Sequence, residues 1–226
     1  MSPQQVNPLP DALTEEKVAD FRSKICDIAI RQLTDNGIDR LSMRSIAREM
    51  GYSATALYSY YRNKEEILSA VKEDLFNRLS DSLHEIGERP LDPWLKLRMG
   101  LETYATFASA EPAAYVLALA PIRDTASYEG LQMAELRFRE AFESLIKPLI
   151  SAGQMSGEPS ILAGLFWAMA HGLTTLSMAG KLPDRNSTDF NLLWLEAVTL
   201  LGRGANPNTS RKMQSKATES QFSLDL

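Results

Sequence analysis

A dense set of charged side chains lies between residues 40 and 64. This stretch holds five bases and one acid, Glu49, so its local net charge is +4 in a chain whose formal charge is −5. The bases are Arg40, Arg44, Arg48, Arg62 and Lys64. A local basic patch can bind phosphates even when the whole chain is acidic, and Tyr58 and Tyr60 add hydroxyl groups that can contact phosphate oxygens. The stretch therefore predicts a nucleic-acid-binding surface. The alternative is a solvated basic turn in an ordinary helical bundle.

The other residues capable of chemistry form no catalytic or metal-binding pattern. His84, His171 and the single cysteine, Cys26, lack the spacing of zinc ligands, so we expect no metal and no cofactor. Two serine–lysine pairs match the spacing of acyl-transfer enzymes but have no companion motifs. They are Ser69 with Lys72 and Ser144 with Lys147. We therefore expect no enzyme activity. One cysteine also excludes an intramolecular disulfide and fits a reducing cytoplasm.

Two short helices joined by a turn are predicted to carry the basic residues. Ser42 can cap the first helix by accepting a backbone N–H of its first turn. The apolar positions of this helix are Met43, Ile46, Ala47 and Met50. Gly51 follows them, where a left-handed C-cap favours glycine. Ser53 can cap a second helix over Ala54 to Tyr61, with Leu57 and Tyr61 facing inward.

A third cap follows closely. Asn63, with Glu66 three residues later, predicts that another helix begins there through a capping box. Three caps in about 22 residues leave room only for short helices at a steep angle, as in a helix-turn-helix. Because Ala54, Thr55 and Ala56 are small, the second helix can bring its N-terminus close to base edges.

This pattern resembles the DNA-binding domain of TetR-family transcriptional regulators over roughly residues 15 to 75. The matching residues are Gly37, Leu41-Ser42-Met43-Arg44, Ile46-Ala47, Met50-Gly51-Tyr52-Ser53, Leu57-Tyr58-Ser59-Tyr60-Tyr61 and Asn63-Lys64-Glu65-Glu66-Ile67-Leu68. By position, the resemblance implies that the residues meeting the DNA backbone or a groove edge are Ser42 and Arg44. It implies that those facing bases are Ser53, Ala54, Thr55 and Ala56, and that those holding phosphates are Tyr58, Tyr60 and Lys64. With alanine at two base-facing positions, more of the specificity would come from thymine methyl contacts and DNA shape.

Two helices in the C-terminal half are unusually apolar. Residues 159–180 contain no lysine, arginine, aspartate or glutamate. Their length could suit a membrane span, but the glycines, the histidine and the absence of a basic flank argue against one. Residues 190–202 are apolar nearly all round, and a helix that is apolar on every side is buried on every side. We therefore expect both helices to face the core on one side and a second copy of the chain on the other. The expected dimer interface comprises Leu162, Phe166, Met169, Leu173, Leu193, Trp194, Val198 and Leu201.

A ligand pocket could lie within the same half. Trp167 and His171 are four residues apart on one helix face, where they could line an apolar cavity or simply pack in the core. Other candidates for pocket walls are Trp94, Met99, Tyr104, Phe107, Tyr115, Met133 and Phe138, all of which could equally be core residues. Trp167, His171 and Gly172, with residues 104–115, resemble TetR C-terminal domains that carry a Trp-x-x-x-His-Gly signature. That resemblance implies a helical ligand-binding and dimerising domain.

The sequence thus predicts an all-α fold of about nine helices. The predicted parts are a disordered arm (1–13), a three-helix helix-turn-helix domain (14–62), a connecting helix (63–86), a ligand-binding and dimerisation domain (87–204) and a disordered tail (205–226). The resemblance implies a cytoplasmic, homodimeric repressor of a near-palindromic double-stranded DNA operator, released by a small apolar effector and without a membrane partner. A regulator that responds to a protein partner is also open. The alternative from another class is a helical protein that binds or sequesters a small molecule without specific DNA recognition.

Overall fold

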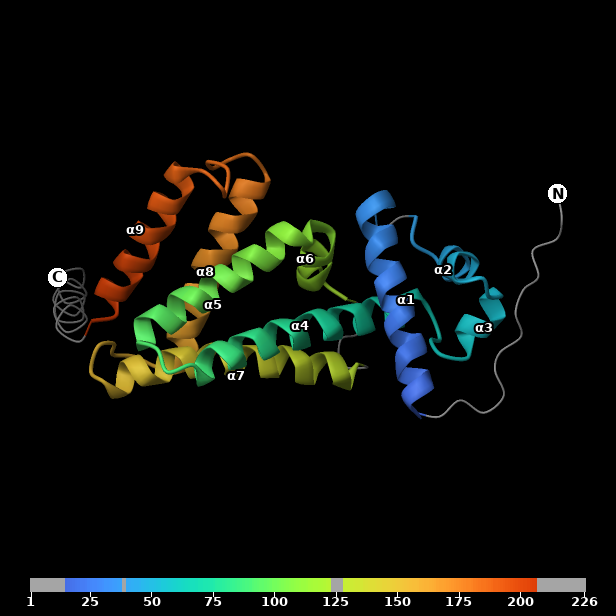
Figure 1. The fold of residues 1–226 in the computed structure, drawn as a ribbon, viewed down its shortest axis with the longest axis horizontal. Helices are drawn as coiled ribbons and strands as arrows, with labels where there is room; N and C mark the ends of the chain where they lie inside the picture. The colour runs from blue at the N-terminus through green and yellow to red at the C-terminus, as the bar shows by residue number, and fades with distance from the viewer. Residues whose placement is uncertain (1–14, 38–39, 123–127, 207–226) are drawn as a thin grey trace, which may run out of the picture. The chain divides into compact units, whose positions relative to one another are not determined.

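The computed structural model describes residues 15–37, 40–122 and 128–206, which form nine helices and no strand (Figure 1). The helices are α1 (Glu15–Asn36), α2 (Met43–Met50), α3 (Ala54–Tyr58), α4 (Lys64–Glu88), α5 (Pro93–Ala110), α6 (Pro112–Leu119), α7 (Glu129–Ser151), α8 (Pro159–Met178) and α9 (Thr188–Gly204). The predicted all-α class and helix number are therefore confirmed for the described chain. The predicted N-terminal arm and nearly all of the predicted tail lie outside the described residues.

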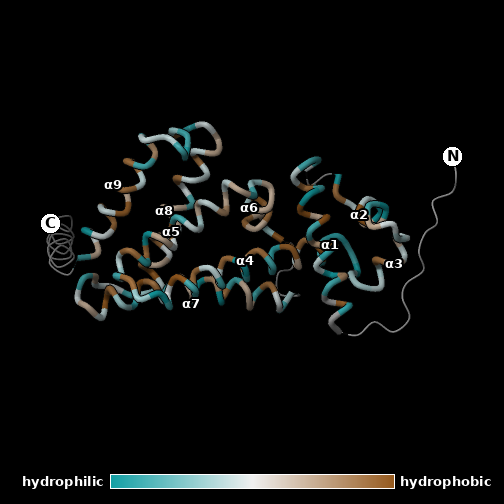
Figure 2. The backbone as a smooth tube through the Cα atoms, in the orientation of Figure 1, coloured by the Kyte–Doolittle hydropathy of each residue, from teal (hydrophilic) through white to brown (hydrophobic). Residues whose placement is uncertain are grey.

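Local sequence signals explain most helix boundaries. Gly37, with φ 75°, follows the end of α1. Asp92 starts α5, because its Oδ1 accepts the backbone N–H groups of Trp94 at 2.9 Å and Leu95 at 3.2 Å. Teal and brown residues alternate along α1 and α4, as expected for amphipathic helices (Figure 2). One predicted boundary was wrong. The second helix of the helix-turn-helix ends at Tyr58 and not at Tyr61.

Pro148, a residue type that favours a kink or an end of a helix, lies inside α7. α7 continues through Pro148 to Ser151. Proline removes only one backbone donor from the helix, and the neighbouring Leu145, Ile146 and Leu149 are all buried. We attribute the continuation of the helix to this packing, which offsets one lost hydrogen bond.

The described helices group into two compact units. The units are residues 1–78 with 110–136, and residues 79–109 with 137–226. In the first unit α1 contacts α2 and α6, and α2 contacts α3. Both ends of α6 are bonded to α4: Arg78 pairs with Glu111 at 3.1 Å, and Lys72 Nζ donates to the carbonyl of Ala120. The predicted domain boundary near residues 87–93 lies between α4 and α5, but the two units divide within α4, and α6 groups with the helix-turn-helix.

The second unit is built around close contacts of α5. Gly100 lies so near α7 that a Cβ atom there would be 2.5 Å from Leu145 Cδ1. Gly202 of α9 similarly admits the ring of Trp94, since a Cβ atom would lie 2.5 Å from its Cη2. Lys96 Nζ donates to the carbonyl of Gly87 at 2.7 Å and so satisfies an end carbonyl of α4. α8 contacts α9, the last described helix.

α8 is the helix on which the membrane alternative depended. By length and composition alone it could cross a membrane, and 33% of its most apolar window is buried. A single helix of this kind is weak evidence, because a core helix passes the same test.

Candidate nucleic-acid interface

The turn between α2 and α3 is fixed by the predicted caps. Ser42 Oγ accepts the N–H of Ser45 at 3.0 Å, and Ser45 Oγ accepts the N–H of Ser42 at 3.0 Å. Gly51 ends α2 in the left-handed region, with φ 76° and ψ 20°, where a side chain would be strained. Ser53 Oγ then accepts the N–H of Ala56 at 3.1 Å and starts α3. The turn geometry is therefore set by hydrogen bonds within about 15 residues of chain.

Glu49, the only acid of the basic stretch, is held by α1. Its Oε1 accepts Arg31 Nη2 at 2.6 Å, and its Oε2 accepts Gln32 Nε2 at 2.5 Å. The bond from Gln32 and then those from Arg31 lower the pKa of Glu49, which keeps the carboxylate ionised and paired. Because Arg31 offsets this negative charge, the positive field of the neighbouring arginines is not cancelled locally. Arg40, Arg44 and Arg48 are all exposed.

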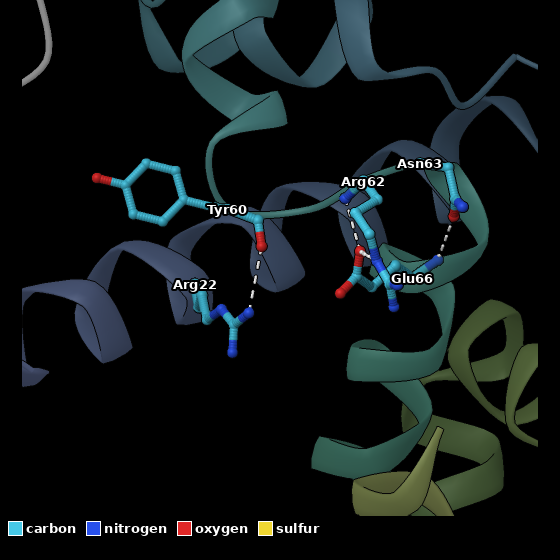
Figure 3. A network of polar contacts seen from close by, with 5 residues as sticks. All are labelled: Arg22, Tyr60, Arg62, Asn63 and Glu66. Carbon is cyan, nitrogen blue, oxygen red and sulfur yellow. Dashed lines mark hydrogen bonds and ion pairs between the residues drawn. The ribbon is translucent and has the colours of Figure 1, made fainter. Parts of the chain in front are cut away.

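Aromatic contacts join α1 to the segment after α3. The ring of Phe21 lies 4.4 Å from that of Tyr60 and meets Tyr52 edge-on at 5.2 Å. Arg22 Nη2 donates to the carbonyl of Tyr60 at 3.2 Å (Figure 3), and its guanidinium lies over the ring of Tyr61. Tyr61 is buried as predicted. These contacts fix the backbone on which Tyr60 sits.

At the start of α4, one of the two hydrogen bonds of the predicted capping box is formed and the other has a different partner. Asn63 Oδ1 accepts the N–H of Glu66 at 2.8 Å, as expected. Glu66 Oε2 instead accepts the N–H of Arg62 at 2.6 Å, one residue earlier than the reciprocal bond of a capping box (Figure 3). Glu66 also pairs with the Arg62 side chain at 3.3 Å. The bonds orient the first turn of α4, where Lys64 lies.

All but one of the predicted DNA-contact residues are at least partly exposed to solvent. Ser42, Arg44, Thr55 and Tyr58 are exposed. Those that are half-buried are Ser53, Ala54, Tyr60 and Lys64. The exception is Ala56, whose side chain is only 4% exposed and belongs to the core between the short helices. Ala56 was expected to face bases. Its helical position next to Leu57 turns the methyl group inward, so it is not available to a ligand.

The family models match both halves of the chain. The model described as "Bacterial regulatory proteins, tetR family" matches residues 25–71, and "Tetracyclin repressor-like, C-terminal domain" matches residues 97–201. The chain belongs to the TetR family. This family consists of transcriptional regulators and not enzymes, as the sequence predicted. The narrower assignment to the Trp-x-x-x-His-Gly group stays a prediction.

Individual relatives agree with this TetR assignment. The HTH-type transcriptional regulator Rv1816 of Mycobacterium tuberculosis is 36% identical over 75 residues, which is 33% of this chain and 32% of that protein. The chain thus matches about a third of the length of such relatives. The uncharacterized regulator Rv0681 of the same organism is 25% identical over 84% of this chain and 83% of its own length. A Rhodococcus sp. RHA1 protein of unknown function has a similar fold, with TM-score 0.69 and 24% identity, covering 82% of this chain and 94% of that one.

Within the TetR C-terminal domain, four of the predicted pocket residues come together. The Trp167 ring lies 5.3 Å from Phe138 and 6.5 Å from Tyr104, and Tyr104 Oη lies 3.4 Å from His171 Nδ1. Burial lowers the pKa of His171, so its neutral form is favoured. Beside these rings, an apolar cavity of about 140 Å³ opens between α7 and α8. The residues lining it are Phe138, Arg139, Phe142, Glu143, Ser160, Ala163, Gly164 and Trp167.

The remaining predicted pocket residues do not line this cavity. Met133 is 72% exposed, because its position in α7 shares a face with the exposed Glu129 and Glu140. Tyr115 is buried in the first unit. Trp94 packs against Gly202. Met99 and Phe107 of α5 are half-buried and are not among the residues that line the cavity.

None of the eight predicted dimer residues is exposed at the surface of the chain. Four of the eight are buried within the chain: Leu162, Phe166, Trp194 and Val198. Those that are half-buried are Met169, Leu173, Leu193 and Leu201. The large exposed apolar side chains of these helices are instead Ile161, Leu165, Leu176, Met178, Leu192, Leu195 and Leu200. Both helices are apolar on two faces, so their sequences cannot tell which face packs inside the chain.

Proposed function

We propose that the chain is a TetR-type regulator that binds double-stranded DNA through α2, the start of α3 and the first turn of α4. The observation that carries this proposal is the basic stretch of residues 40–64, whose only acid, Glu49, is paired with Arg31 of α1. In a helix-turn-helix the second short helix enters the major groove with its N-terminal residues at the base edges. Here those residues are Ser53, Ala54 and Thr55, which α2 and its caps present at the surface.

The contacts divide by chemistry. Arg44, Tyr58, Tyr60 and Lys64 bind phosphates and fix the register, and the Ser42 hydroxyl meets the backbone at a groove edge. Thr55 reads bases through its hydroxyl and methyl groups. Ser53 already accepts a backbone N–H, but its hydroxyl proton can still be donated. The Ala54 methyl suits contact with a thymine methyl, so DNA shape carries much of the remaining specificity.

The regulator acts as a homodimer joined through the outer faces of α8 and α9. Leu165 of α8 is 50% exposed, and Leu192 and Leu200 of α9 are 57% and 63% exposed. α8 contains no lysine, arginine, aspartate or glutamate. Burying apolar surface of this kind stabilises association by about 25 cal/mol per Å². A two-fold dimer presents two copies of α3 to half-sites about 34–36 Å apart on a near-palindromic operator.

A small apolar effector controls the dimer by binding the cavity between α7 and α8. An apolar cavity of about 150 Å³ is enough to hold a benzene-sized molecule, and the cavity here has about 140 Å³. The effector releases the DNA to the extent that it binds the DNA-free shape more tightly than the DNA-bound one. The protein therefore works as a cytoplasmic repressor. The family model that matches the C-terminal half, named after a tetracycline repressor, supports this reading.

The test is selection of bound DNA from the genome that encodes the chain, followed by gel-shift titration on the selected site. We expect a near-palindrome bound by two chains, with affinity that falls steeply as salt rises, because lysine and arginine displace condensed counterions. Binding that shows no sequence preference, or a site without two-fold symmetry, would overturn the proposal.

A further inference from the structure

A second cavity, of about 460 Å³, lies in the second unit between α5, the loop that joins α8 to α9, and the start of α9. It shares no lining residue with the α7–α8 cavity. We call it the polar pocket. Its lining includes the polar side chains of Glu102, Arg185, Asn186 and Asn191 and the aromatic rings of Phe190 and Trp194. Its volume is within the usual range for small-molecule sites, about 300–1,000 Å³.

Arg185 is the distinctive residue of the polar pocket. Its guanidinium donates to Thr106 Oγ1 at 2.9 Å, to Ser109 Oγ at 3.3 Å and to the carbonyl of Glu102 at 3.4 Å. All three acceptors are neutral. None of the ion pairs among the described residues includes Arg185. The side chain is also half-buried, and burial lowers its pKa although the Glu102 charge opposes that effect.

A half-buried cation without a paired anion costs free energy. The loop nevertheless holds Arg185 firmly in this place. Asp184 Oδ1 accepts the N–H of Asn186 at 2.9 Å, and Asp184 O accepts the hydroxyl of Ser187 at 2.5 Å. Ser187 in turn caps α9 by accepting the N–H of Phe190 at 3.1 Å. The guanidinium is thus positioned in advance, which lowers the entropic cost of binding a ligand.

The rest of the lining defines the ligand further. Guanidinium groups have five N–H donors, and the three bonds above leave donors for an anion. The side chains of Asn186 and Asn191 are exposed and can supply amide donors. The rings of Phe190 and Trp194 lie 5.9 Å apart at the base of the pocket, and the pocket reaches only a small part of them, since Phe190 is 2% and Trp194 8% exposed. The exposed Glu102 carboxylate on the rim repels a second negative charge.

We propose that the polar pocket binds a small organic monocarboxylate with an apolar or aromatic body. The carboxylate accepts from Arg185 and the two asparagine amides, and the body contacts the small accessible parts of Phe190 and Trp194 at the base of the pocket. An ammonium or hydroxyl group beside the carboxylate would face Glu102, so amino-acid-like molecules suit the site. This site is separate from the α7–α8 cavity and does not depend on the proposed DNA-binding function.

The test is isothermal titration of the full chain with three matched probes and inorganic phosphate. Phenylacetate and L-phenylalanine carry the carboxylate, and phenylacetamide has the same body without charge. We expect at least one carboxylate to bind at least tenfold more tightly than the amide, and phosphate to bind more weakly than that carboxylate. Equal binding of acid and amide, or no binding of either acid at about 1 mM, would overturn the proposal.

Variants locate the binding. Arg185→Gln removes the charge and should weaken carboxylate binding at least tenfold, whereas Arg203→Gln, an exposed arginine of the last turn of α9, should not. Because Arg185→Gln also loses bonds to α5, Asn191→Glu provides a second variant that keeps Arg185 and adds a repelling charge at an exposed position. It should weaken binding as much. Binding that is lost in Arg139→Gln and kept in Arg185→Gln would place the ligand in the α7–α8 cavity and overturn the assignment.

Discussion

The α2–α3 region and the α8–α9 region satisfy their polar and apolar groups in opposite ways. In α2 and α3 the helix starts are capped by Ser42 and Ser53, and Glu49 is paired. Among the described residues, the buried side-chain polar atoms without a hydrogen-bond partner all lie on α8 or α9. They are Trp167 Nε1, Thr174 Oγ1 and Trp194 Nε1. Most of the large apolar side chains that are exposed among the described residues also lie on these two helices.

The α2–α3 region satisfies its polar groups within one chain. The α8–α9 region leaves buried polar atoms without hydrogen bonds and apolar side chains exposed. A buried donor without a partner costs about 1–3 kcal/mol, and exposed leucines forgo the free energy of burial. Trp167 lines the α7–α8 cavity and Trp194 lines the polar pocket. The α2–α3 region is completed by its own caps and by contacts with α1, whereas α8 and α9 would gain from the proposed dimer and the proposed ligands. The predictions below challenge this contrast at individual residues.

The largest effect is expected from Leu165→Glu on the outer face of α8. Placing a charge in the proposed interface should convert the dimer to a monomer in sedimentation velocity. Because a dimer binds two half-sites at once, operator affinity should then fall about 100-fold or more. The matched control is Leu136→Glu on α7, where the wild-type leucine is also 50% exposed. A Leu165→Glu protein that stays dimeric and binds normally would show that this face is not the interface.

The next largest effect concerns the core of the α2–α3 region. Leu57 is fully buried, so Leu57→Ala should destabilise the chain by about 2–5 kcal/mol through lost burial and a residual cavity. Chemical denaturation followed by circular dichroism measures this change. Leu95→Ala is the control, because Leu95 is 41% exposed and a surface truncation costs about 0.5 kcal/mol or less. If both variants lose the same free energy of unfolding, the core of the α2–α3 region is not well packed.

A smaller effect is expected at the phosphate contacts. Lys64→Ala should weaken binding to all DNA sequences alike and reduce the slope of log affinity against log salt by about 1. Thr55→Ala should instead change the preferred sequence. Arg98→Ala, which removes an exposed charge from α5, is the control for net charge. If Lys64→Ala leaves the salt slope unchanged, the assigned DNA-binding face is wrong.

The DNA-binding half could be predicted because its signals are local. Ser42, Gly51 and Ser53 act within four residues of their own positions. Their spacing therefore fixes the helices before any distant contact is known. The contacts that sequence reasoning missed are long-range, above all the bonds from Arg31 and Gln32 to Glu49 and the stacking of Phe21 on Tyr60. The apolar spacing of α1 indicated only that Phe21 would face inward.

The helical class of the C-terminal half could be predicted from the sequence, but which faces of its helices are buried could not. Apolar residues surround both α8 and α9, so their helical period does not distinguish the face in the core from the face at the surface. For that reason Phe166 and Val198 were expected at a dimer interface and are instead buried within the chain. The polar pocket had no signal at all, since Arg185 meets α5 only through the fold.

The smallest expected effect is a pH dependence that belongs to α8 alone. Burial lowers the pKa of His171 in the folded chain, so the unfolded chain takes up a proton first as pH falls below about 6.5. The stability gained by keeping His171 neutral is therefore present above that pH and is lost as pH falls through the folded pKa. Thermal unfolding between about pH 7.5 and 5 should show a falling midpoint in the wild type and a flatter profile in His171→Gln. His84→Gln removes the other, exposed histidine and should keep the wild-type profile. Identical profiles in the wild type and His171→Gln would mean that α8 does not resist this charge, which would weaken the contrast between the two regions.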